Sequence, residues 1–546
     1  MTNVRNLGLG LALGVAGLAS GCGREPATSS GTGAPYLTIF LVDGLQQGAF
    51  QDQLAAGHLP ALQRLIDDGT YVVNGVTSFP SVSGYAYYPF MTGVPAAHSG
   101  VAGIRWFDRS RTEGNFRNYI GATSVNLNAD FAPSIPTLFE MFPDDNSTST
   151  NDFVNRGAKK VIIDEWSYAL STYGNAKEAE VVRAMFPAQA DYFSGTKAAM
   201  QVAIDDLAAR PKIQWVTLPH LDAIFHFEGP TPKYVQALQL TDALIASYRA
   251  ASVLDGTEAE RIYAVVSDHG GAEVTKHFDV AQYLDQLGIA MDRDIAVHLL
   301  DSKLRDPVSR YDDRSAIVAI QGNLMTHVYL RKPGVVGAAG WATPRTRAEL
   351  AAYPTPHGPI DLVATFRAQP GISLVVVREG DHRIGLYDAR GAAEITVADK
   401  SYSYRIVDGE DPLGYRGDPH AGALVGTGRH PSRDWLTATY QTRFPDTVAQ
   451  LGSFMSEPGP GDLVLVAAAD YDLADDFEPI VGNFHGGHGG LEAGQFRVPF
   501  IVSGPGVKHT RVDTARAEDI GATLEVLMHA RPSRAPEGDV LPIVEP

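Results

Sequence analysis

Apolar runs of four to six residues alternate with amphipathic segments along much of this chain. The strand-like runs are 38–42, 71–76, 213–218, 262–266 and 499–502. Helix-like patterns cover 59–68, 178–185, 197–207, 234–252 and 520–528. Continuous apolar strands that alternate with helices are typical of parallel strands buried on both faces. The pattern therefore predicts an α/β fold: a doubly wound, mostly parallel central sheet with helices on both faces.

The pattern changes between 277 and 460, where short strands are separated by turns. The clearest of these strands are 371–377, 383–387 and 393–397. Short strands joined by tight turns favour antiparallel pairing. We expect an inserted, smaller α+β subdomain over 277–460 that contains a small antiparallel sheet. The catalytic core is then expected in two parts, 35–276 and 461–546, the second beginning with a strand at 463–467.

The N-terminus has the layout of a secretory signal. Arg5 precedes an apolar stretch at 7–19 that is too short to span a membrane, and small residues lead to Cys22, the only cysteine. A cysteine directly after small residues resembles the bacterial lipoprotein signal, in which this cysteine carries the lipid. The alternative is an ordinary cleaved signal. We expect a signal peptide at 1–22, a flexible tether at 23–34, and export to the bacterial envelope or periplasm with a lipid anchor at Cys22.

Composition and charge limit the possible partners. The chain has 546 residues, 44% of them hydrophobic and 9% aromatic, which is enough to fill a large core. Its net charge of −19 argues against nucleic-acid polymers and anionic membrane surfaces as partners. A small phosphorylated substrate remains possible, because a bound divalent cation dominates the field in its own site.

Aspartates and histidines follow strand-like runs at four places in the chain. They are Asp43, Asp222, His226, Asp268, His269 and, in a glycine-rich stretch after the run 462–466, His488. Ligands of an open α/β sheet collect outside the carboxyl ends of its strands. Carboxylate and imidazole groups suit zinc-like cations. We therefore predict a hydrolase with a pair of divalent metal ions.

Each of these side chains also has a plainer interpretation. Asp222 and His226 are four residues apart, which places them on one helical face, but they could be a capping residue and a surface histidine. Asp268 and His269 could form a polar turn after a strand. His485 competes with His488 in the same glycine-rich loop, and we prefer His488 because glycines flank it on both sides.

A serine near the second strand is a candidate nucleophile. Ser83 follows the run 71–76 and precedes a predicted helix at 85–91. Backbone N–H groups at a helix N-terminus can hold a phosphoryl oxygen, and a metal ion would lower the pKa of the serine hydroxyl. Serine before a helix is also a common N-cap, and Ser81 is an alternative nucleophile.

Seven short motifs, taken in order, resemble the alkaline phosphatase superfamily and most closely its type I phosphodiesterase/nucleotide pyrophosphatase family. They are Leu-Val-Asp-Gly-Leu at 41–45, the block 79–93 ending in Met-Thr-Gly, His-Ser-Gly at 98–100, the stretch 222–230, Ser-Asp-His-Gly-Gly at 267–271, Gly-His-Gly at 487–489 and Ser-Gly-Pro-Gly at 503–506. Together they extend over nearly the whole mature chain.

The resemblance implies a role for each candidate residue. One metal ion would be surrounded by Asp43, Ser83, Asp268 and His269, and the other by Asp222, His226 and His488. Both ions would be zinc. Ser83 takes the place of the family's nucleophile, judged by its distance from Thr92, and would form a covalent phospho-enzyme on a small phosphoester substrate.

One departure from the family pattern affects the substrate. The family has an asparagine shortly after the His-x-Gly motif, whereas this chain has Gly-Ile-Arg-Trp-Phe-Asp at 103–108. Arg105 could hold two phosphoryl oxygens in its place, or it could be a surface arginine in a salt bridge. We expect a phosphodiesterase or nucleotide pyrophosphatase. A phosphomonoesterase is the alternative, followed by a non-catalytic envelope binding protein. The sequence does not indicate an oligomeric state.

Overall fold

A mixed sheet of eight strands forms the centre of the computed structural model, which describes residues 35–120, 126–162, 192–291, 307–474, 485–532 and 534–546. Its strand order is β23-β2-β22-β8-β1-β7-β5-β6. Their bounds are β1 (Tyr36–Val42), β2 (Gly69–Val76), β5 (Ser147–Thr150), β6 (Lys160–Ile162), β7 (Ile213–Leu218), β8 (Arg261–Val266), β22 (Arg497–Ser503) and β23 (Thr510–Arg516). All neighbours pair in parallel except the two that contact β22, which confirms the mostly parallel sheet.

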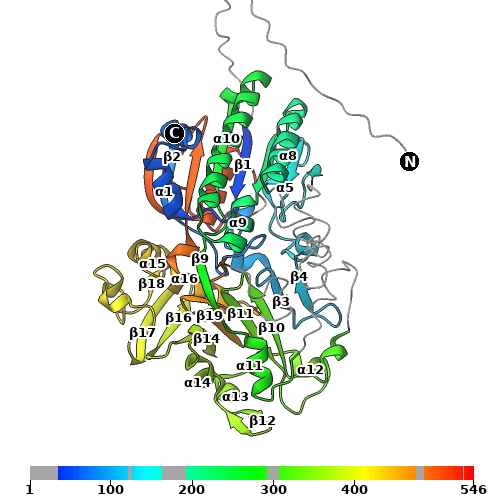
Figure 1. The fold of residues 1–546 in the computed structure, drawn as a ribbon, viewed down its shortest axis with the longest axis vertical. Helices are drawn as coiled ribbons and strands as arrows, with labels where there is room; N and C mark the ends of the chain where they lie inside the picture. The colour runs from blue at the N-terminus through cyan, green and yellow to red at the C-terminus, as the bar shows by residue number, and fades with distance from the viewer. Residues whose placement is uncertain (1–34, 121–125, 163–191, 292–306, 475–484, 533) are drawn as a thin grey trace, which may run out of the picture. The chain divides into compact units, whose positions relative to one another are not determined.

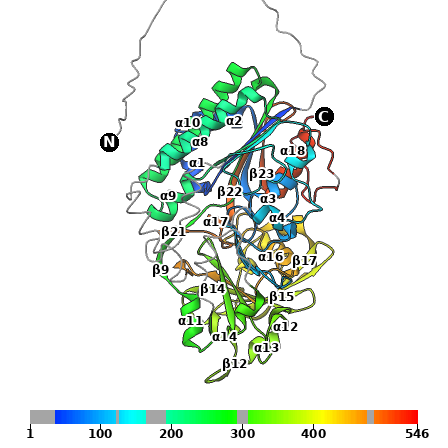
Figure 2. The ribbon, with the colours of Figure 1, turned by 90° about the vertical axis from the view of Figure 1, so that its right-hand side faces the viewer.

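Helices cover both faces of this sheet. Successive side chains along each strand point to opposite faces, so both faces are apolar and need cover. On β1, Leu37 and Ile39 face one hydrophobic core, whereas Phe40 and Val42 face another. Helices α8 (Tyr192–Asp205) and α10 (Pro232–Asp255) lie on one side, and α3 (Tyr88–Thr92) and α18 (Ala517–Leu527) lie on the other (Figures 1 and 2). The predicted α/β class is confirmed.

The other helices, and the strands outside the two large sheets, have the following bounds. The helices are α1 (Gln47–Ala55), α2 (Pro60–Asp67), α4 (Leu127–Asp130), α5 (Leu138–Met141), α9 (His220–Glu228), α11 (Val280–Gln286), α12 (Ala338–Trp341), α13 (Arg347–Ala351), α14 (Leu362–Arg367), α15 (Ser432–Thr439), α16 (Thr447–Ser456) and α17 (Ala493–Phe496). The small strands are β3 (Arg105–Phe107), β4 (Phe116–Asn118), β9 (Ala272–His277), β12 (Tyr353–Thr355), β13 (Gly358–Ile360), β20 (Asp470–Asp472) and β21 (Gly486–Gly487). The predicted helix at 178–185, the signal peptide, the tether and Cys22 lie outside the described residues.

A second sheet of eight strands is antiparallel throughout, with the order β10-β11-β19-β14-β15-β16-β17-β18. Its strands are β10 (Ala316–Gln321), β11 (Met325–Leu330), β14 (Ile372–Gly380), β15 (Arg383–Tyr387), β16 (Gly391–Ala398), β17 (Ser401–Gly409), β18 (His430–Pro431) and β19 (Leu463–Ala467). The antiparallel pairing is as predicted, but the sheet is not small.

Strand β19 corrects the prediction that 463–467 resumes the central sheet. It lies between β11 and β14 and pairs with both. An apolar run of five residues suits a buried position in either sheet, so its pattern alone could not decide between them. The proposed limits of the inserted subdomain, 277–460, stay a prediction.

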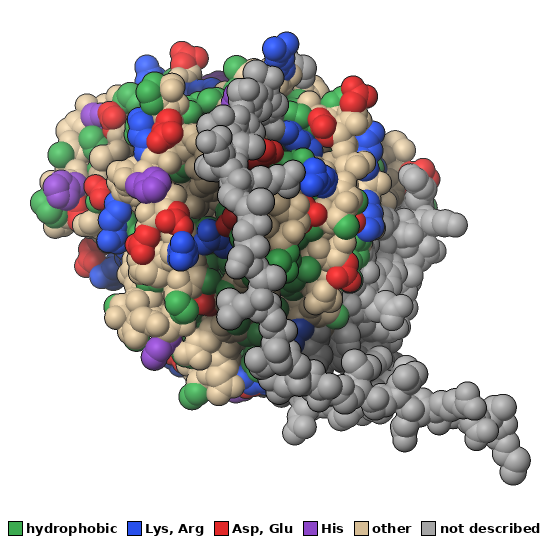
Figure 3. Space-filling model, turned by 90° about the horizontal axis from the view of Figure 1, so that it is seen from above, with side chains coloured by type: hydrophobic (Ala, Val, Ile, Leu, Met, Phe, Trp, Pro, Cys, Tyr) green, Lys and Arg blue, Asp and Glu red, His purple; other side chains and the backbone are tan. Residues whose placement is uncertain are grey.

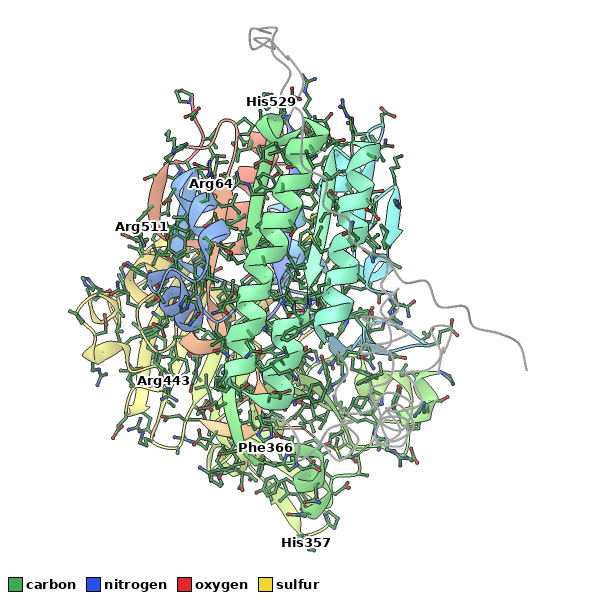
Figure 4. All side chains as sticks on the ribbon, turned by 45° about the horizontal axis from the view of Figure 1, so that its top comes forward. Arg64, His357, Phe366, Arg443, Arg511 and His529 are labelled. Atoms are coloured by element: carbon green, nitrogen blue, oxygen red, sulfur yellow. The ribbon has the colours of Figure 1, made fainter. Side chains whose placement is uncertain are left out.

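One hydrophobic core is shared by the two sheets. Ile39 of the central sheet and Val376 of the second sheet belong to the same buried cluster, whereas Val375 and Val377 face a cluster on the outer side. Helix α14, with Phe366, and the β12–β13 turn, with His357, lie at the end of this unit beyond the second sheet, and Arg64 and His529 lie toward the other end (Figure 4).

The outer surface carries charges of both signs. Acidic and basic side chains are interspersed on the face seen in Figure 3, so neither sign forms a continuous patch there. Within the described part of the chain, no helix combines the length and apolar character needed to cross a membrane.

A buried ion pair joins the helices of the two sheets. Arg516, at the start of α18, donates from Nε to Asp446 Oδ2 at 2.6 Å and from Nη2 to Asp446 Oδ1 at 2.7 Å. Asp446 stands at the start of α16, and both side chains are buried. Removing one charge would leave the other buried without its partner.

We therefore expect Asp446→Asn to lower the free energy of unfolding by about 3 kcal/mol, measured by denaturant unfolding. Asparagine preserves the size of the side chain and tolerates the left-handed backbone of this position (φ 56°). The matched control is Glu410→Gln, which breaks the exposed Arg390–Glu410 pair and should cost less than about 1 kcal/mol. Equal losses in the two variants would contradict this role for the buried pair.

Candidate active site

Three adjacent parallel strands bring three aspartates to one edge of the central sheet. Strand β1 lies between β7 and β8, so the carboxyl ends of all three meet. Asp43 follows β1 directly, Asp268 follows β8, and Asp222 lies in α9, which begins after β7. Gly44 permits the close approach: its φ is +71°, and a Cβ there would lie 2.8 Å from Asp222 Cα.

Helix α9 places Asp222 and His226 one turn apart on the same face, as the spacing predicts. Asp222 Oδ1 lies 3.4 Å from His226 Nε2.

His488 reaches the site by a route that the sequence did not indicate. The sequence predicts it beyond a strand of the central sheet, but the apolar run before it forms β19 of the second sheet, and β21, which directly precedes it, pairs with β9. The His488 N–H donates to the Gly322 carbonyl at 2.8 Å, and the Leu324 N–H donates to the His488 carbonyl at 2.9 Å. The turn between β10 and β11 therefore holds this histidine at the edge of the central sheet.

All three histidines turn the same ring atom toward the aspartates. Each Nδ1 lies within hydrogen-bond distance of a backbone carbonyl: His226 to Gly486 at 2.9 Å, His269 to Gly270 at 2.9 Å and His488 to Ser81 at 2.8 Å. A carbonyl accepts only, so these bonds assign the proton to Nδ1 and leave each Nε2 with a lone pair. His226 Nε2 and His488 Nε2 are 3.1 Å apart, a contact of two lone pairs that a cation would relieve.

The six side chains form two overlapping groups with the spacing of metal ligands. Asp43, Asp268 and His269 make one group, and Asp222, His269 and His488 make the other, with His226 beside it. His269 Nε2 is 3.3 Å from Asp43 Oδ1 and 3.2 Å from Asp268 Oδ2. Its ring stacks on His488, with centroids 3.5 Å apart. The division of the ligands between two ions, including the place of His226, stays a prediction.

Two carboxylate oxygens of this cluster favour a cation site over a purely hydrogen-bonded network. Asp222 Oδ1 and Asp268 Oδ2 are buried and have no hydrogen-bond partner among the described residues. A buried, unpaired carboxylate oxygen is costly, and a divalent cation would satisfy it. The donor set of carboxylates and neutral imidazoles fits zinc-like ions.

Burial and nearby charges shift the pKa values of the side chains in this cluster. Burial, followed by the nearby charges of Asp268 and Asp222, raises the pKa of Asp43 well above its ordinary value. Burial likewise raises the pKa of Asp222 and of Asp268. It lowers the pKa of His269 and, more strongly, of His488, which keeps both rings neutral, as metal ligands must be.

The two candidate serines have different surroundings. Ser83 Oγ lies 3.3 Å from Asp43 Oδ2 and 3.3 Å from His269 Nε2, at the cluster itself. Ser81 is fully buried, and its hydroxyl donates to the Gly490 carbonyl and accepts the Gly489 N–H. Ser83 is thus placed for chemistry, and Ser81 fastens the loop that carries His488.

The helix after Ser83 begins later than predicted. It was expected at 85–91, but α3 starts at Tyr88, five residues beyond Ser83. Pro89 has no N–H and is tolerated only in the first turn of a helix, so the helix cannot extend far toward Ser83. Ser83 lies in a turn, and the expected anion site at the helix N-terminus is not adjacent to it.

The two remaining candidates, His485 and Arg105, lie in different surroundings. His485 is exposed and belongs to neither ligand group, which leaves His488 as the histidine of this loop in the cluster. Arg105 is buried in β3, where it pairs with Asn118 of β4. Its contact with substrate stays a prediction.

The sequence favours Tyr87 as a core residue rather than as part of the site, whereas the structure places its hydroxyl at the cluster. Its hydroxyl donates to Asp43 Oδ2 at 2.8 Å, and its buried ring packs against Trp215 and Phe153. Burial raises its pKa well above the ordinary value, so it remains a donor. A tyrosine in an aromatic-rich stretch is most often a core residue, and no local pattern marked this one.

The fold and the candidate metal ligands agree with a family of phosphoester hydrolases. The sequence model of the family described as "Type I phosphodiesterase / nucleotide pyrophosphatase" matches residues 37–345, more than half of the chain. The chain belongs to this family and is a hydrolase that acts on phosphoester bonds. No curated protein matches it in sequence.

Solved structures support the same fold. An inactive variant of murine ectonucleotide pyrophosphatase/phosphodiesterase 5 in complex with AMP has a TM-score of 0.52 at 12% identity and covers 92% of this chain and 97% of its own. The human protein of that name has a TM-score of 0.52 at 11% identity and covers 92% of this chain and 96% of its own. At such low identity the likeness concerns the fold alone.

We expect Tyr87→Phe to weaken the binding of divalent metal by about 10- to 100-fold, because groups that hydrogen-bond to a ligand orient it. Zinc titration of the metal-stripped protein measures the affinity. The control is Tyr88→Phe, whose buried hydroxyl has no hydrogen-bond partner among the described residues. Unchanged affinity in Tyr87→Phe would show that Asp43 needs no such support.

Proposed function

We propose that this protein is a phosphodiesterase or nucleotide pyrophosphatase that acts through a covalent phosphoserine at Ser83 and a two-metal, zinc-like site. The observation that carries the proposal is the position of Ser83 Oγ, 3.3 Å from both Asp43 Oδ2 and His269 Nε2. A hydroxyl that faces a buried set of metal-ligating atoms is the arrangement expected of an activated nucleophile. Membership of the phosphodiesterase family supports the substrate class.

Two bound zinc ions would lower the pKa of the Ser83 hydroxyl and of water, and would neutralise phosphoryl charge. In the first step, the Ser83 hydroxyl releases its proton to solvent water, its oxygen bonds to phosphorus, and the bond to the leaving oxygen breaks; the leaving oxygen then takes up a proton from solvent. In the second step, a water oxygen bonds to phosphorus, the Ser83–phosphorus bond breaks, and the serine hydroxyl is restored. The metal ion next to Ser83 would be held by Asp43, Asp268 and His269. The second ion would be held by Asp222, His226 and His488.

Arg105 is the proposed contact for the non-bridging phosphoryl oxygens. A guanidinium presents two parallel N–H donors, which matches a phosphoryl group. This residue takes the place of an uncharged amide in the family pattern, so a phosphomonoester with its additional negative charge is the second candidate substrate.

The protein is further proposed to work outside the cytoplasm. The signal-like pattern at 1–22 and the tether at 23–34 support export to the bacterial envelope, with lipid attached at Cys22. The expected substrate is a small phosphoester.

Ser83→Ala is expected to lower kcat by at least about 10³-fold while two metal ions per chain are retained, because the nucleophile is lost but the carboxylate and imidazole ligands remain. Turnover of an aryl phosphoester and elemental analysis of the same sample measure both quantities. Ser81→Ala is the comparison variant and should keep most of its kcat. The reverse result would make Ser81 the nucleophile, and turnover retained in both variants would point to direct attack by water.

Phosphodiester preference is tested by comparing kcat/KM for a bis-aryl phosphodiester and the matching aryl phosphomonoester. We expect the diester to be the better substrate, and Arg105→Ala to lower its kcat/KM by about 10-fold or more through the lost charge-assisted hydrogen bonds. A strong preference for the monoester would replace the first candidate with the second. Metal content below one ion per chain, together with no turnover, would favour a binding protein.

A further inference from the structure

Gln321, the last residue of β10, bonds to the backbone of the segment that carries Arg105. Its Oε1 accepts the Ile104 N–H at 2.9 Å, and its Nε2 donates to the Arg105 carbonyl. The residue is fully buried. The side-chain amide of Gln321 therefore bonds to one backbone N–H and one backbone carbonyl of this short stretch, as a neighbouring strand would.

The same residue begins the turn that holds His488. Directly after Gln321, the Gly322 carbonyl accepts the His488 N–H at 2.8 Å, and the Leu324 N–H donates to the His488 carbonyl at 2.9 Å. A single turn of the second sheet thus contacts both the proposed phosphoryl-binding segment and a proposed metal ligand, which are far apart in sequence.

Two glycines approach Gln321 closely. A Cβ at Gly103 would lie 2.2 Å from Gln321 Oε1, and a Cβ at Gly489 would lie 2.1 Å from the Gln321 carbonyl oxygen. Both neighbours are glycines with positive φ, so backbone approaches the residue from two sides. Close-packed contacts of this kind transmit small displacements.

We propose that Gln321 is a positioning residue, which fixes the Arg105 segment relative to His488 and so sets the distance from the guanidinium to the metal cluster. The inference rests on the proposed function and deepens it. Gln321 does not touch the reacting atoms; it acts through the Ile104–Arg105 backbone. A misplacement of about 1 Å in a substrate-binding group can cost as much as about 100-fold in rate.

The test compares the metal-loaded wild-type protein with Gln321→Met, which preserves length and removes both hydrogen bonds. We expect kcat/KM for the bis-aryl phosphodiester to fall by about 10- to 100-fold, while metal content stays at the wild-type level. Gln321→Asn, which shortens the amide but keeps it polar, is the second variant should Gln321→Met fail to fold, and a similar loss is expected.

The matched control is Thr326→Val in the adjacent strand β11. Thr326 is fully buried, and its hydroxyl donates to the His327 carbonyl at 3.3 Å, so the control also removes one buried hydrogen bond from the same sheet. Its kcat/KM should stay within about 2-fold of wild type, since it contacts neither segment. Denaturant unfolding of both variants measures the cost in stability.

A double variant separates positioning from general damage. If Gln321 acts through Arg105, adding Gln321→Met to Arg105→Ala should lower kcat/KM by less than about 3-fold, because effects in one unit are not additive. Full multiplication of the two losses would overturn the proposal, as would equal kcat/KM in Gln321→Met and Thr326→Val. Absence of turnover in the wild-type protein is a distinct result: it would refute the proposed function, and this inference with it.

Discussion

The arrangement of the active site depends on keeping three carboxylates and three imidazole lone pairs together in a buried place. Burial raises the pKa of Asp43, Asp222 and Asp268, and neighbouring carboxylates raise those of Asp43 and Asp268 further. His226 and His488 face each other with Nε2 atoms 3.1 Å apart. Such a set is unfavourable without cations and favourable with them. The fold tolerates this cost because each histidine is fixed from behind by a backbone carbonyl, and Asp43 is fixed by Tyr87.

Two sheets share the task of building this cluster. The central sheet supplies the aspartates at the ends of β1, β7 and β8, where parallel strands necessarily bring their carboxyl ends together. The second sheet supplies the turn between β10 and β11, which holds His488. The two sheets share a hydrophobic core, with Ile39 on one sheet and Val376 on the other. This core fixes the aspartates relative to His488. The site is therefore a product of the junction rather than of either sheet.

Much of the fold and of the cluster could be predicted because the signals are local. The runs before Asp43, Asp222 and Asp268 are largely apolar, which is typical of parallel strands buried on both faces. The spacing of Asp222 and His226 fixes them on one helical face by geometry alone. The run at 463–467 was assigned to the wrong sheet because its composition suits either one. Helix α3 starts later than the apolar pattern predicts because Pro89 fits only its first turn.

The sequence by itself determined the fold class, the family and the residue types of the candidate metal site, because strand periodicity and the order of the motifs depend on residues that are neighbours in the chain. Only the tertiary structure decided that Ser83 rather than Ser81 faces the cluster and that His488 rather than His485 enters it. It also revealed Tyr87 and Gln321, whose hydrogen bonds span 44 and 216 residues of sequence. Contacts between such distant positions form only when the chain is folded, and no local pattern of side chains encodes them.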